Sequence, residues 1–322
     1  MKKRLLVLTL SALMVVGAVG CGNKNASENK GTNGTKEVQQ ENKERKVSYL
    51  GKEYTVQGKD PKVVIAGSME SMEDALILGI KPVGAMTVGG KFPEIFKDIT
   101  GESKPIGEKI QPNIEAIVSL KPDIILGSTK FPAEALEKLN KVKETIPVSH
   151  ISSDWEANLM LMGEISGKED KAKEIIKNYK DEVKEAKGKF GDKMKDKKVV
   201  AIRIRNGNIA IYPEAVFFNP VLYNELGLTV PEPVKAAKAQ EITSLEKFSE
   251  LNPDYIFLQF SESENADKPK ALEELKKNPI WNSINAVKND KVFVNTVDPL
   301  AQGGTAWSKS NFLKAAVSEL SK

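Results

Sequence analysis

The sequence predicts an α/β protein of two lobes with mostly parallel sheets, joined by one long helix. The first observation is an internal repeat, because residues 113–126 (NIEAIVSLKPDIIL) and 244–257 (SLEKFSELNPDYIF) align without a gap at an offset of 131. Each copy indicates an amphipathic helix, a Pro-Asp break and an apolar strand. The second observation is a highly charged segment between the copies, residues 168–189, which has the pattern of a single helix.

The charged segment has no Gly and no Pro from Lys168 to Lys187. Apolar residues recur there at steps of three and four, which predicts a narrow apolar stripe on a helix roughly 30 Å long. The stripe consists of Ala172, Ile175, Ile176, Tyr179, Val183 and Ala186. Gly188 and Gly191 are expected to end the helix. A surface helix of one lobe is the alternative, but the repeat on either side favours a rigid tie over residues 167–192.

The N-terminus has the pattern of a bacterial export signal. Basic residues at 2–4 precede an apolar run, 5–16, that is too short to span a bilayer. Residues 18–21 (AVGC) resemble a lipobox, which implies removal of residues 1–20 and a diacylglyceryl (palmitate-type) anchor on Cys21. The protein would then sit on the outer face of the cytoplasmic membrane, as on a Gram-positive cell surface. An ordinary signal peptide with an incidental cysteine is the alternative.

Composition limits the class of partner. Cys21 is the single cysteine, so no intrachain disulfide forms. Without residues 1–20, which hold three basic and no acidic residues, the net charge falls from +4 to +1. A nearly neutral protein is a poor candidate for binding nucleic acid. Residues 21–46 are polar, lack aromatic residues and show no periodicity, which predicts a flexible linker.

Local signals predict the elements of the first lobe, residues 47–166. In the helix expected over 68–79, Ser71 and Asp74 suit a capping box and Gly79 suits a stop. The other elements expected around the first repeat copy are a hairpin over 47–57, strands over 63–66, 83–86 and 147–151, and helices over 92–99, 132–142 and 155–166.

The second lobe, residues 193–322, is expected to begin with a strand over 199–205. Asn206-Gly207 then predicts a hairpin with residues 209–212. The second repeat copy, a strand over 292–297 and a helix over 306–320 complete the lobe. Alternating strands and helices indicate mostly parallel sheets covered by helices. Ligands of such sheets lie beyond the carboxyl ends of the strands, which here is the cleft between the lobes.

The sequence lacks the motifs of common catalytic and metal sites. It contains no phosphate-binding Gly-x-x-x-x-Gly-Lys loop, no Gly-x-Ser-x-Gly elbow and no cysteine cluster. Its single histidine, His150, ends an apolar strand, and a structural or hinge role is favoured over catalysis. A Zn²⁺ or Mn²⁺ site would need several histidines or clustered carboxylates. The residues therefore predict neither catalytic nor metal-ligating side chains.

Basic residues occur instead where strands are expected to end. Arg203 and Arg205 are two apart on one strand, so their side chains leave the same face. Two guanidinium groups there are unfavourable unless they reach water or an anion, and two solvated arginines on an edge strand are the alternative. Lysines stand at comparable places in both lobes, namely Lys109, Lys130, Lys235 and Lys238. Together these residues predict a cationic cleft for a bulky anion.

Several segments carry a resemblance to one family: SMESMEDA, GKFPEIFKDIT, GEKIQPNIE, STKFP, IPVSHIS, RIRNGNI, VKAAKAQE, NPIWNSI and VDPLAQGGTAWSK. With the lipobox, the charged helix and the doubled Glu…Pro-Asp unit, they resemble the iron-siderophore and cobalamin class of ABC-transporter solute-binding proteins, from about Val47 to the C-terminus. The resemblance implies a class III periplasmic-binding-protein-like fold with a helical backbone and a small closure on binding.

The resemblance also implies a role. The expected ligand is a ferric catecholate siderophore of the bacillibactin or enterobactin type, captured for a two-subunit ABC permease that imports iron. The ligand-binding set falls on Lys109, Lys130, Arg203, Arg205, Lys238 and Gln240, and the permease-docking glutamates are Glu115 and Glu246. N-terminal capping inherited from the duplication is the alternative role for the two glutamates. The protein is expected to be a monomer, not an enzyme.

The chemistry of such a ligand agrees with the residues. Iron(III) in a tris-catecholate is wrapped by catechol oxygens, so the protein supplies no iron ligand and needs no cofactor. Lysine and arginine meet the trianion through charge-assisted hydrogen bonds and its rings through cation–π contacts. The alternatives are a hydroxamate siderophore, haem or cobalamin as cargo, or a lipid-anchored hydrolase or chelatase-like enzyme on the same scaffold.

Overall fold

The computed structural model describes residues 44–190 and 194–322, and residues 41–322 form one compact unit. The expected signal peptide (1–20), Cys21 and most of the expected linker lie outside the described residues. In the two described ranges, no helix is long and apolar enough to cross a membrane.

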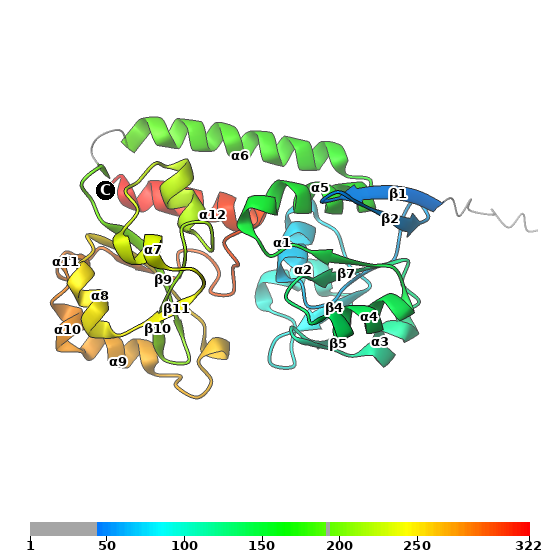
Figure 1. Ribbon diagram of the computed structural model, residues 1–322, viewed down its shortest axis with the longest axis horizontal. Helices are drawn as coiled ribbons and strands as arrows, with labels where there is room; N and C mark the ends of the chain where they lie inside the picture. The colour runs from blue at the N-terminus through cyan, green and yellow to red at the C-terminus, as the bar shows by residue number, and fades with distance from the viewer. Residues whose placement is uncertain (1–43, 191–193) are drawn as a thin grey trace, which may run out of the picture. The chain divides into compact units, whose positions relative to one another are not determined.

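The described chain contains two α/β halves, here called the first half (44–166) and the second half (194–322), and each has its own sheet (Figure 1). The expected α/β class with two sheets is confirmed. The described part of the first half already includes strand residues 44–46, ahead of the expected boundary at 47, which stays a prediction.

The first half holds a hairpin and a six-stranded sheet. The hairpin pairs β1 (Glu44–Tyr49) with β2 (Lys52–Gln57), as expected. The sheet has the order β6-β5-β4-β3-β7-β8 and is parallel except for β6. Its strands are β3 (Val63–Ile65), β4 (Gly84–Thr87), β5 (Lys104–Glu108), β6 (Gln111–Pro112), β7 (Ile124–Ser128) and β8 (Thr145–Val148). The expected strand over 147–151 thus begins and ends earlier, and the pair β5–β6 was not expected.

The helices of the first half are α1 (Met69–Leu78), α2 (Lys97–Thr100), α3 (Ile114–Leu120), α4 (Ala133–Val142) and α5 (Trp155–Ser166). The capping box expected in α1 is wrong. The N-cap is Ser68, whose hydroxyl accepts a hydrogen bond from the Ser71 amide, and both Ser71 and Asp74 are buried inside the helix. Gly79 ends α1 in the left-handed region, as expected. The helix expected over 92–99 is instead a 3₁₀ turn, η1 (Glu94–Phe96), followed by the short α2.

The second half has a five-stranded sheet in the order β11-β10-β9-β12-β13. Strands β9, β12 and β13 are parallel, and β10 and β11 extend the sheet antiparallel. The strands are β9 (Val199–Arg205), β10 (Asn208–Ile211), β11 (Glu241–Thr243), β12 (Tyr255–Phe260) and β13 (Val292–Val294). Strand β9 is central, so the edge-strand alternative for Arg203 and Arg205 is wrong.

The helical elements of the second half begin with a π-helical turn, η4 (Pro220–Glu225), and α7 (Glu232–Ala236). They continue with α8 (Leu245–Leu251), a 3₁₀ turn η5 (Glu262–Glu264), α9 (Ala271–Lys277), α10 (Pro279–Asn282), α11 (Asn285–Lys288) and α12 (Ala306–Leu320). The bounds expected for β9 and α12 are those observed, whereas β13 is shorter than the expected 292–297.

The internal repeat is structural. Helices α3 and α8 are each seven residues long. The Asn113 and Ser244 side chains cap them by accepting hydrogen bonds from backbone amides three residues on. Both helices end in the left-handed region, at Lys121 (φ 49°) and Asn252 (φ 47°).

The Pro-Asp step of each copy fastens a neighbouring strand. The Asp123 carboxylate accepts a hydrogen bond from the Lys62 amide at 2.8 Å, just before β3. The Asp254 carboxylate accepts one from the Lys198 amide at 2.9 Å, just before β9. The same side-chain bond thus aligns β7 with β3 and β12 with β9, which gives the aspartate of both copies the same structural role.

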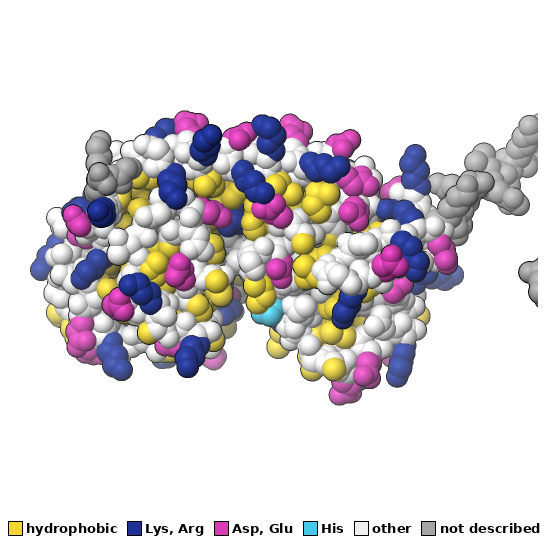
Figure 2. Space-filling model, turned by 45° about the horizontal axis from the view of Figure 1, so that its top comes forward, with side chains coloured by type: hydrophobic (Ala, Val, Ile, Leu, Met, Phe, Trp, Pro, Cys, Tyr) yellow, Lys and Arg dark blue, Asp and Glu magenta, His cyan; other side chains and the backbone are white. Residues whose placement is uncertain are grey.

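The charged segment forms one continuous helix, α6 (Glu169–Phe190), as expected. It does not end at Gly188, which lies inside the helix, and Gly191 is outside the described residues. The helix packs against α5 of the first half and against α12 and η4 of the second. Lysine side chains alternate with Asp and Glu along its outer face, and the molecule is hollowed between the two halves (Figure 2).

Beneath α6, one cluster of buried apolar side chains extends through both halves, with members such as Met72, Tyr179, Phe218 and Phe312. There are two smaller clusters. One surrounds Ile125 in the first half, and the other surrounds Ile202 and Trp281 in the second half. Because burial of apolar area is the main stabilising term, the shared cluster ties the stability of the two halves together.

Candidate ligand-binding cleft

In the first half, the site begins at the hairpin between β5 and β6, which presents Lys109. The Glu108 carboxylate holds this hairpin by accepting hydrogen bonds from the Thr87 hydroxyl at 2.7 Å and from the amides of Gly89 and Gly90 at 3.0 and 2.8 Å. The hydrogen bond from Thr87 is the main cause that lowers the pKa of Glu108, which keeps this carboxylate ionised.

The hairpin lies directly against the segment that follows β3. Gly67 has φ 72°, and a Cβ there would lie 2.5 Å from the Lys109 carbonyl oxygen and 2.1 Å from the Phe131 ring. No side chain fits in that space, and the left-handed conformation also favours glycine. The fold thus requires glycine at position 67 to bring Lys109 close to the N-terminus of α1.

Lys130 follows β7 and makes an ion pair with Glu70, in the first turn of α1. Its Nζ donates to Glu70 Oε1 at 2.7 Å. The Glu70 side chain is 5% exposed and that of Lys130 is 38% exposed, so the carboxylate is enclosed and the ammonium is partly open to solvent. The Lys130 ammonium can therefore contact a bound anion, while Glu70 fixes the orientation of the lysine side chain.

In the second half, Arg203 on β9 is buried and largely occupied by the protein itself. Its Nε and Nη2 donate to Gln259 Oε1 at 3.0 and 2.5 Å, and Nη2 also donates to the Ala301 carbonyl at 2.6 Å. The guanidinium carbon lies 4.9 Å from the centroid of the Phe217 ring. Arg203 therefore joins β9, β12 and the segment before α12, and its contact with a ligand stays a prediction.

Arg205, two residues on, is more exposed. Its Nη2 donates to Glu264 Oε1 at 2.7 Å, and its Nη1 donates to Gln240 Oε1 at 2.6 Å. Tyr212 donates its hydroxyl hydrogen to the same Gln240 oxygen at 3.0 Å. Arg203 Nη1 lies 3.5 Å from Glu264 Oε1, so one carboxylate oxygen faces both guanidinium groups, as expected for side chains on one face of a strand. Gln240, Arg205 and Glu264 line a hollow of about 420 Å³.

Lys109 interacts electrostatically with charged residues of both halves, namely the Lys130–Glu70 pair in the first and Arg203 and Glu264 in the second. Burial, helped by the positive charges of Lys130 and Arg203, lowers the pKa of Lys109 from the ordinary 10.5 to about 8. The negative charges of Glu70 and Glu264 oppose this effect. Because these charges belong to residues of both halves, the side chains share one electrostatic environment. We call Lys109, Lys130, Arg203 and Arg205 the cleft cations.

Lys238 and Lys235 differ from the cleft cations. Lys238 is exposed, and its side chain makes no ion pair within the described part of the chain. Lys235 pairs with Glu232 one turn away on α7, at 2.7 Å, which is a local surface contact. The ligand-binding role expected for Lys238 stays a prediction.

His150 is hydrogen-bonded to Thr129. Its Nδ1 lies 2.7 Å from the Thr129 hydroxyl, whose oxygen also accepts a hydrogen bond from the His150 amide at 3.2 Å. Partial burial, and then the charge of Lys130, lower the pKa of His150. These contacts support a structural role. Among the described residues, no group of three or more His, Cys, Asp or Glu side chains is arranged to hold a metal ion.

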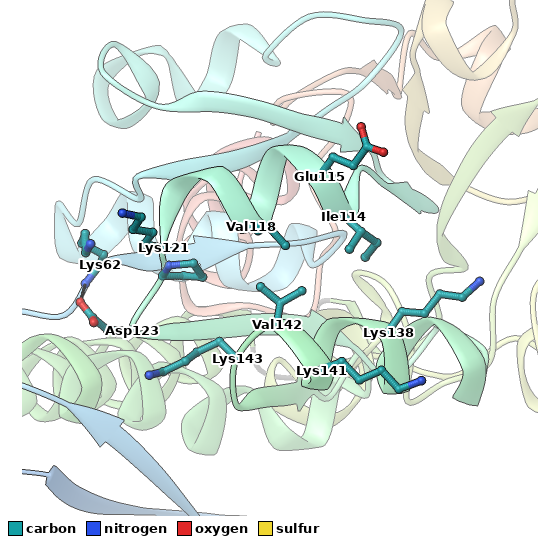
Figure 3. Close-up of a pocket in the computed structure, with 11 residues that line it drawn as sticks. Lys62, Ile114, Glu115, Val118, Lys121, Asp123, Lys138, Lys141, Val142 and Lys143 are labelled. Atoms are coloured by element: carbon teal, nitrogen blue, oxygen red, sulfur yellow. Dashed lines mark hydrogen bonds between the residues drawn. The ribbon is translucent and has the colours of Figure 1, made fainter.

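Glu115 and Glu246 are each the second residue of their helix, and both are exposed. The N-caps are Asn113 and Ser244, so capping by the glutamates themselves is not observed. Glu115 also borders a groove of about 950 Å³ beside α3 and α4, and its carboxylate points away from the other labelled residues (Figure 3). This groove is larger than the hollow at Arg205, but it contains none of the cleft cations.

Sequence reasoning missed the carboxylates of the site. Glu70, Glu73 and Asp74 are all buried on α1, and Glu264 ends η5. The signal in the sequence is the run MESMEDA, in which three acids interrupt an otherwise apolar helix. Acids inside a buried helix require partners, but the local pattern does not name those partners.

The chain is similar in sequence to known binding proteins. Residues 64–298 match the family model described as periplasmic binding protein. The chain is 56% identical over 320 residues to the iron-uptake system-binding protein of Bacillus subtilis, with 99% of each chain covered. It is 29% identical over 267 residues to a probable siderophore-binding lipoprotein of the same species, with 80% of this chain and 79% of the relative covered.

A solved structure is similar as well. The triscatecholate siderophore-binding protein FeuA from Bacillus subtilis, in complex with ferri-bacillibactin, superposes with a TM-score of 0.82 at 59% identity. The match covers 86% of this chain and 98% of that chain.

Proposed function

The chain belongs to the periplasmic binding protein family, and we propose that it is the substrate-binding protein of an ABC importer for iron. It captures a ferric catecholate siderophore of the bacillibactin or enterobactin type and delivers it to the permease. The observation that supports this proposal is the group of cleft cations, which come from both halves and share one electrostatic environment.

The cleft suits a bulky trianion. Lys130 and Arg205 keep partly exposed charged groups beside enclosed carboxylates, and Lys109 adds a third cation. Charge-assisted hydrogen bonds to the catecholate oxygens and cation–π contacts with the rings would hold the ligand. Arg203 supports the site from behind, while Gln240 and Lys238 complete it. Because the siderophore encloses the iron, the protein needs neither a metal-ligating cluster nor a cofactor.

The proposal includes the place of action. Lipidated Cys21 would tether the protein, as a monomer, to the outer face of the cytoplasmic membrane. Glu115 and Glu246, exposed at equivalent points of the two repeat helices, would meet basic pockets on a two-subunit permease. The alignment of the two repeat copies supports this role, and so does the finding that no residue in 44–190 or 194–322 donates a hydrogen bond to either carboxylate.

The test is a fluorescence-quenching titration of the purified protein with a panel of ferric complexes. A ferric tris-catecholate is expected to bind tightly, and a neutral ferric hydroxamate, haem and cobalamin are expected to bind poorly. Tight binding of the hydroxamate and not of the catecholate would refute the proposed cargo.

Gel filtration separates binding from turnover. The absorbance of the ferric catecholate is expected to travel with the protein and to stay unchanged for hours. Loss of the absorbance together with siderophore fragments or free iron would instead indicate a hydrolase or chelatase-like enzyme.

A further inference from the structure

Each half of the cleft carries one carboxylate that makes ion pairs with the cleft cations. In the first half Glu70 pairs with Lys130 at 2.7 Å. In the second half Glu264 pairs with Arg205 at 2.7 Å and faces Arg203 at 3.5 Å. A site that binds an anion therefore contains two groups that repel the anion, and this needs an explanation.

Both carboxylates are held in place by the fold. Glu70 is in the first turn of α1, and its side chain is 5% exposed. Glu264 is 14% exposed, and its carbonyl oxygen accepts a hydrogen bond from the Asn206 amide at 3.1 Å. The next residue, Asn265, donates to the carbonyls of Ile204 and Ser261 at 2.9 and 2.8 Å. These bonds fasten η5 to β9, so Glu264 is a built part of the cleft.

Stability alone does not account for Glu264. Its second oxygen, Oε2, is buried and has no hydrogen-bond partner among the described residues. A buried acceptor without a partner is unfavourable, and replacing ion pairs by apolar groups is often neutral or stabilising. The carboxylate thus points to a role in the cleft.

The charge balance suggests that role. Four cleft cations and their two paired carboxylates leave two net positive charges, so the cleft attracts an anion while its own cations are partly neutralised. A ferric tris-catecholate has three negative charges, and each further negative charge on a complex would face Glu70 and Glu264 as well. Without the carboxylates the cations would repel one another in a partly enclosed site, where charges are weakly screened.

We propose that Glu70 and Glu264 are positioning residues that orient the cleft cations, keep them charged, and set the preference of the cleft for a trianionic complex over more highly charged ones. This inference rests on the proposed function, because it concerns the same cleft and the same class of ligand.

The protonation of Lys109 makes the effect of the two glutamates measurable as a pH dependence of anion binding. Its pKa is already lowered to about 8 by burial and by Lys130 and Arg203, and Glu70 and Glu264 oppose that lowering. Other titratable groups lie near the two glutamates or their cations: Glu73, Asp74 and His150 near Glu70, Tyr212 near Glu264, and Asp298 near Arg203. Removing either glutamate charge lowers the pKa of Lys109 further. Lys109 then loses its proton at a lower pH, and binding of the anion declines earlier as pH rises.

The first experiment measures the binding of a ferric tris-catecholate to the full-length protein between pH 7 and pH 9.5. For Glu70→Gln and Glu264→Gln, the midpoint of the alkaline decline is expected to fall by about half a pH unit or more relative to wild type. The matched control is Glu262→Gln, an exposed residue of the same turn η5, which is expected to keep the wild-type midpoint. Lys109→Arg, which stays charged, is expected to flatten the decline and identifies Lys109 as its origin.

The second experiment measures selectivity at pH 7, where Lys109 is largely protonated. The two probes are the ferric tris-catecholate and the ferric tris-complex of a sulfonated catechol, which has the same geometry and additional negative charge. Glu70→Gln and Glu264→Gln are each expected to lower the preference for the trianion by at least about threefold. Glu264→Asp keeps the charge and is expected to keep the wild-type midpoint and preference.

The outcomes separate the two proposals. If the wild-type protein binds no ferric tris-catecholate, the proposed function fails. If it binds the complex but both Gln variants behave as Glu262→Gln does, the function stands and this inference is wrong. If Glu264→Asp shifts the midpoint as much as Glu264→Gln, side-chain shape and not charge is responsible, and the inference is again wrong.

Discussion

Replacing Glu73 by glutamine is expected to stabilise the protein at alkaline pH. Glu73 is on α1 in the first half and is fully buried. Its Oε1 accepts a hydrogen bond from the Gln302 amide at 2.8 Å, and its Oε2 accepts from the Ser308 hydroxyl at 2.5 Å and from the Thr305 hydroxyl. The partners surround the N-terminus of α12, so this carboxyl fastens the first half to the second.

Burial raises the pKa of Glu73 from the ordinary 4.5 to about 7. The folded protein therefore binds a proton more tightly than the unfolded chain, and stability falls as pH rises from about 4.5 through about 7. This difference in pKa corresponds to about 3 kcal/mol lost by pH 8. Glutamine has nearly the same shape and no charge, and the two hydroxyls can rotate to accept hydrogen bonds from its amide.

The assay is urea unfolding at pH 5 and pH 8. The Glu73→Gln variant is expected to exceed wild type by less than about 1 kcal/mol at pH 5 and by about 3 kcal/mol at pH 8. Glu102→Gln, an exposed change in the same half, is the control and is expected to change neither value. Equal pH dependence of wild type and Glu73→Gln would refute the reasoning, as would a large loss of stability in the variant at pH 8.

Three further predictions concern binding, motion and uptake. Single changes of Lys109, Lys130 or Arg205 to alanine are expected to weaken ferric catecholate binding by about 1–3 kcal/mol each in quenching titrations, and wild-type affinity in all three would contradict the electrostatic account. Because α6 is one continuous helix, closure on ligand is expected to be small, and small-angle scattering that showed a large fall in the radius of gyration would contradict this. The double change Glu115→Ala with Glu246→Ala is expected to leave binding intact and to cost about 0.3–1 kcal/mol of stability per residue, yet to abolish iron uptake by cells. Normal uptake at normal expression would remove the docking role.

Much of the fold follows from local pattern. The expected bounds of α5, β9 and α12 are those observed, because periodicity and flanking residues mark long elements clearly. The internal repeat correctly predicted two equivalent helix–strand units. Short and irregular elements were less predictable: η1 and α2 replace one expected helix, and β5 and β6 form a hairpin that carries Lys109.

Glycine shows why the local signal has limits. Gly188 was expected to end the long helix, yet α6 continues to Phe190, whose side chain is buried. Glycine in a helix interior is unfavourable by roughly 1 kcal/mol, and the burial of one aromatic side chain exceeds that. Gly67 is the opposite case, because its need for glycine comes from the Lys109 carbonyl, which is distant in sequence.

The sequence by itself determined the fold class, the long helix, the repeat and the positions of the basic residues. Only the tertiary structure decided which of those residues share a site and what holds them there. Glu70 meets Lys130 across 60 residues, and Glu264 meets Arg205 across 59. Such pairs depend on the order of strands in a sheet and on the packing of helices, and no local pattern of charge or hydrophobicity specifies that order.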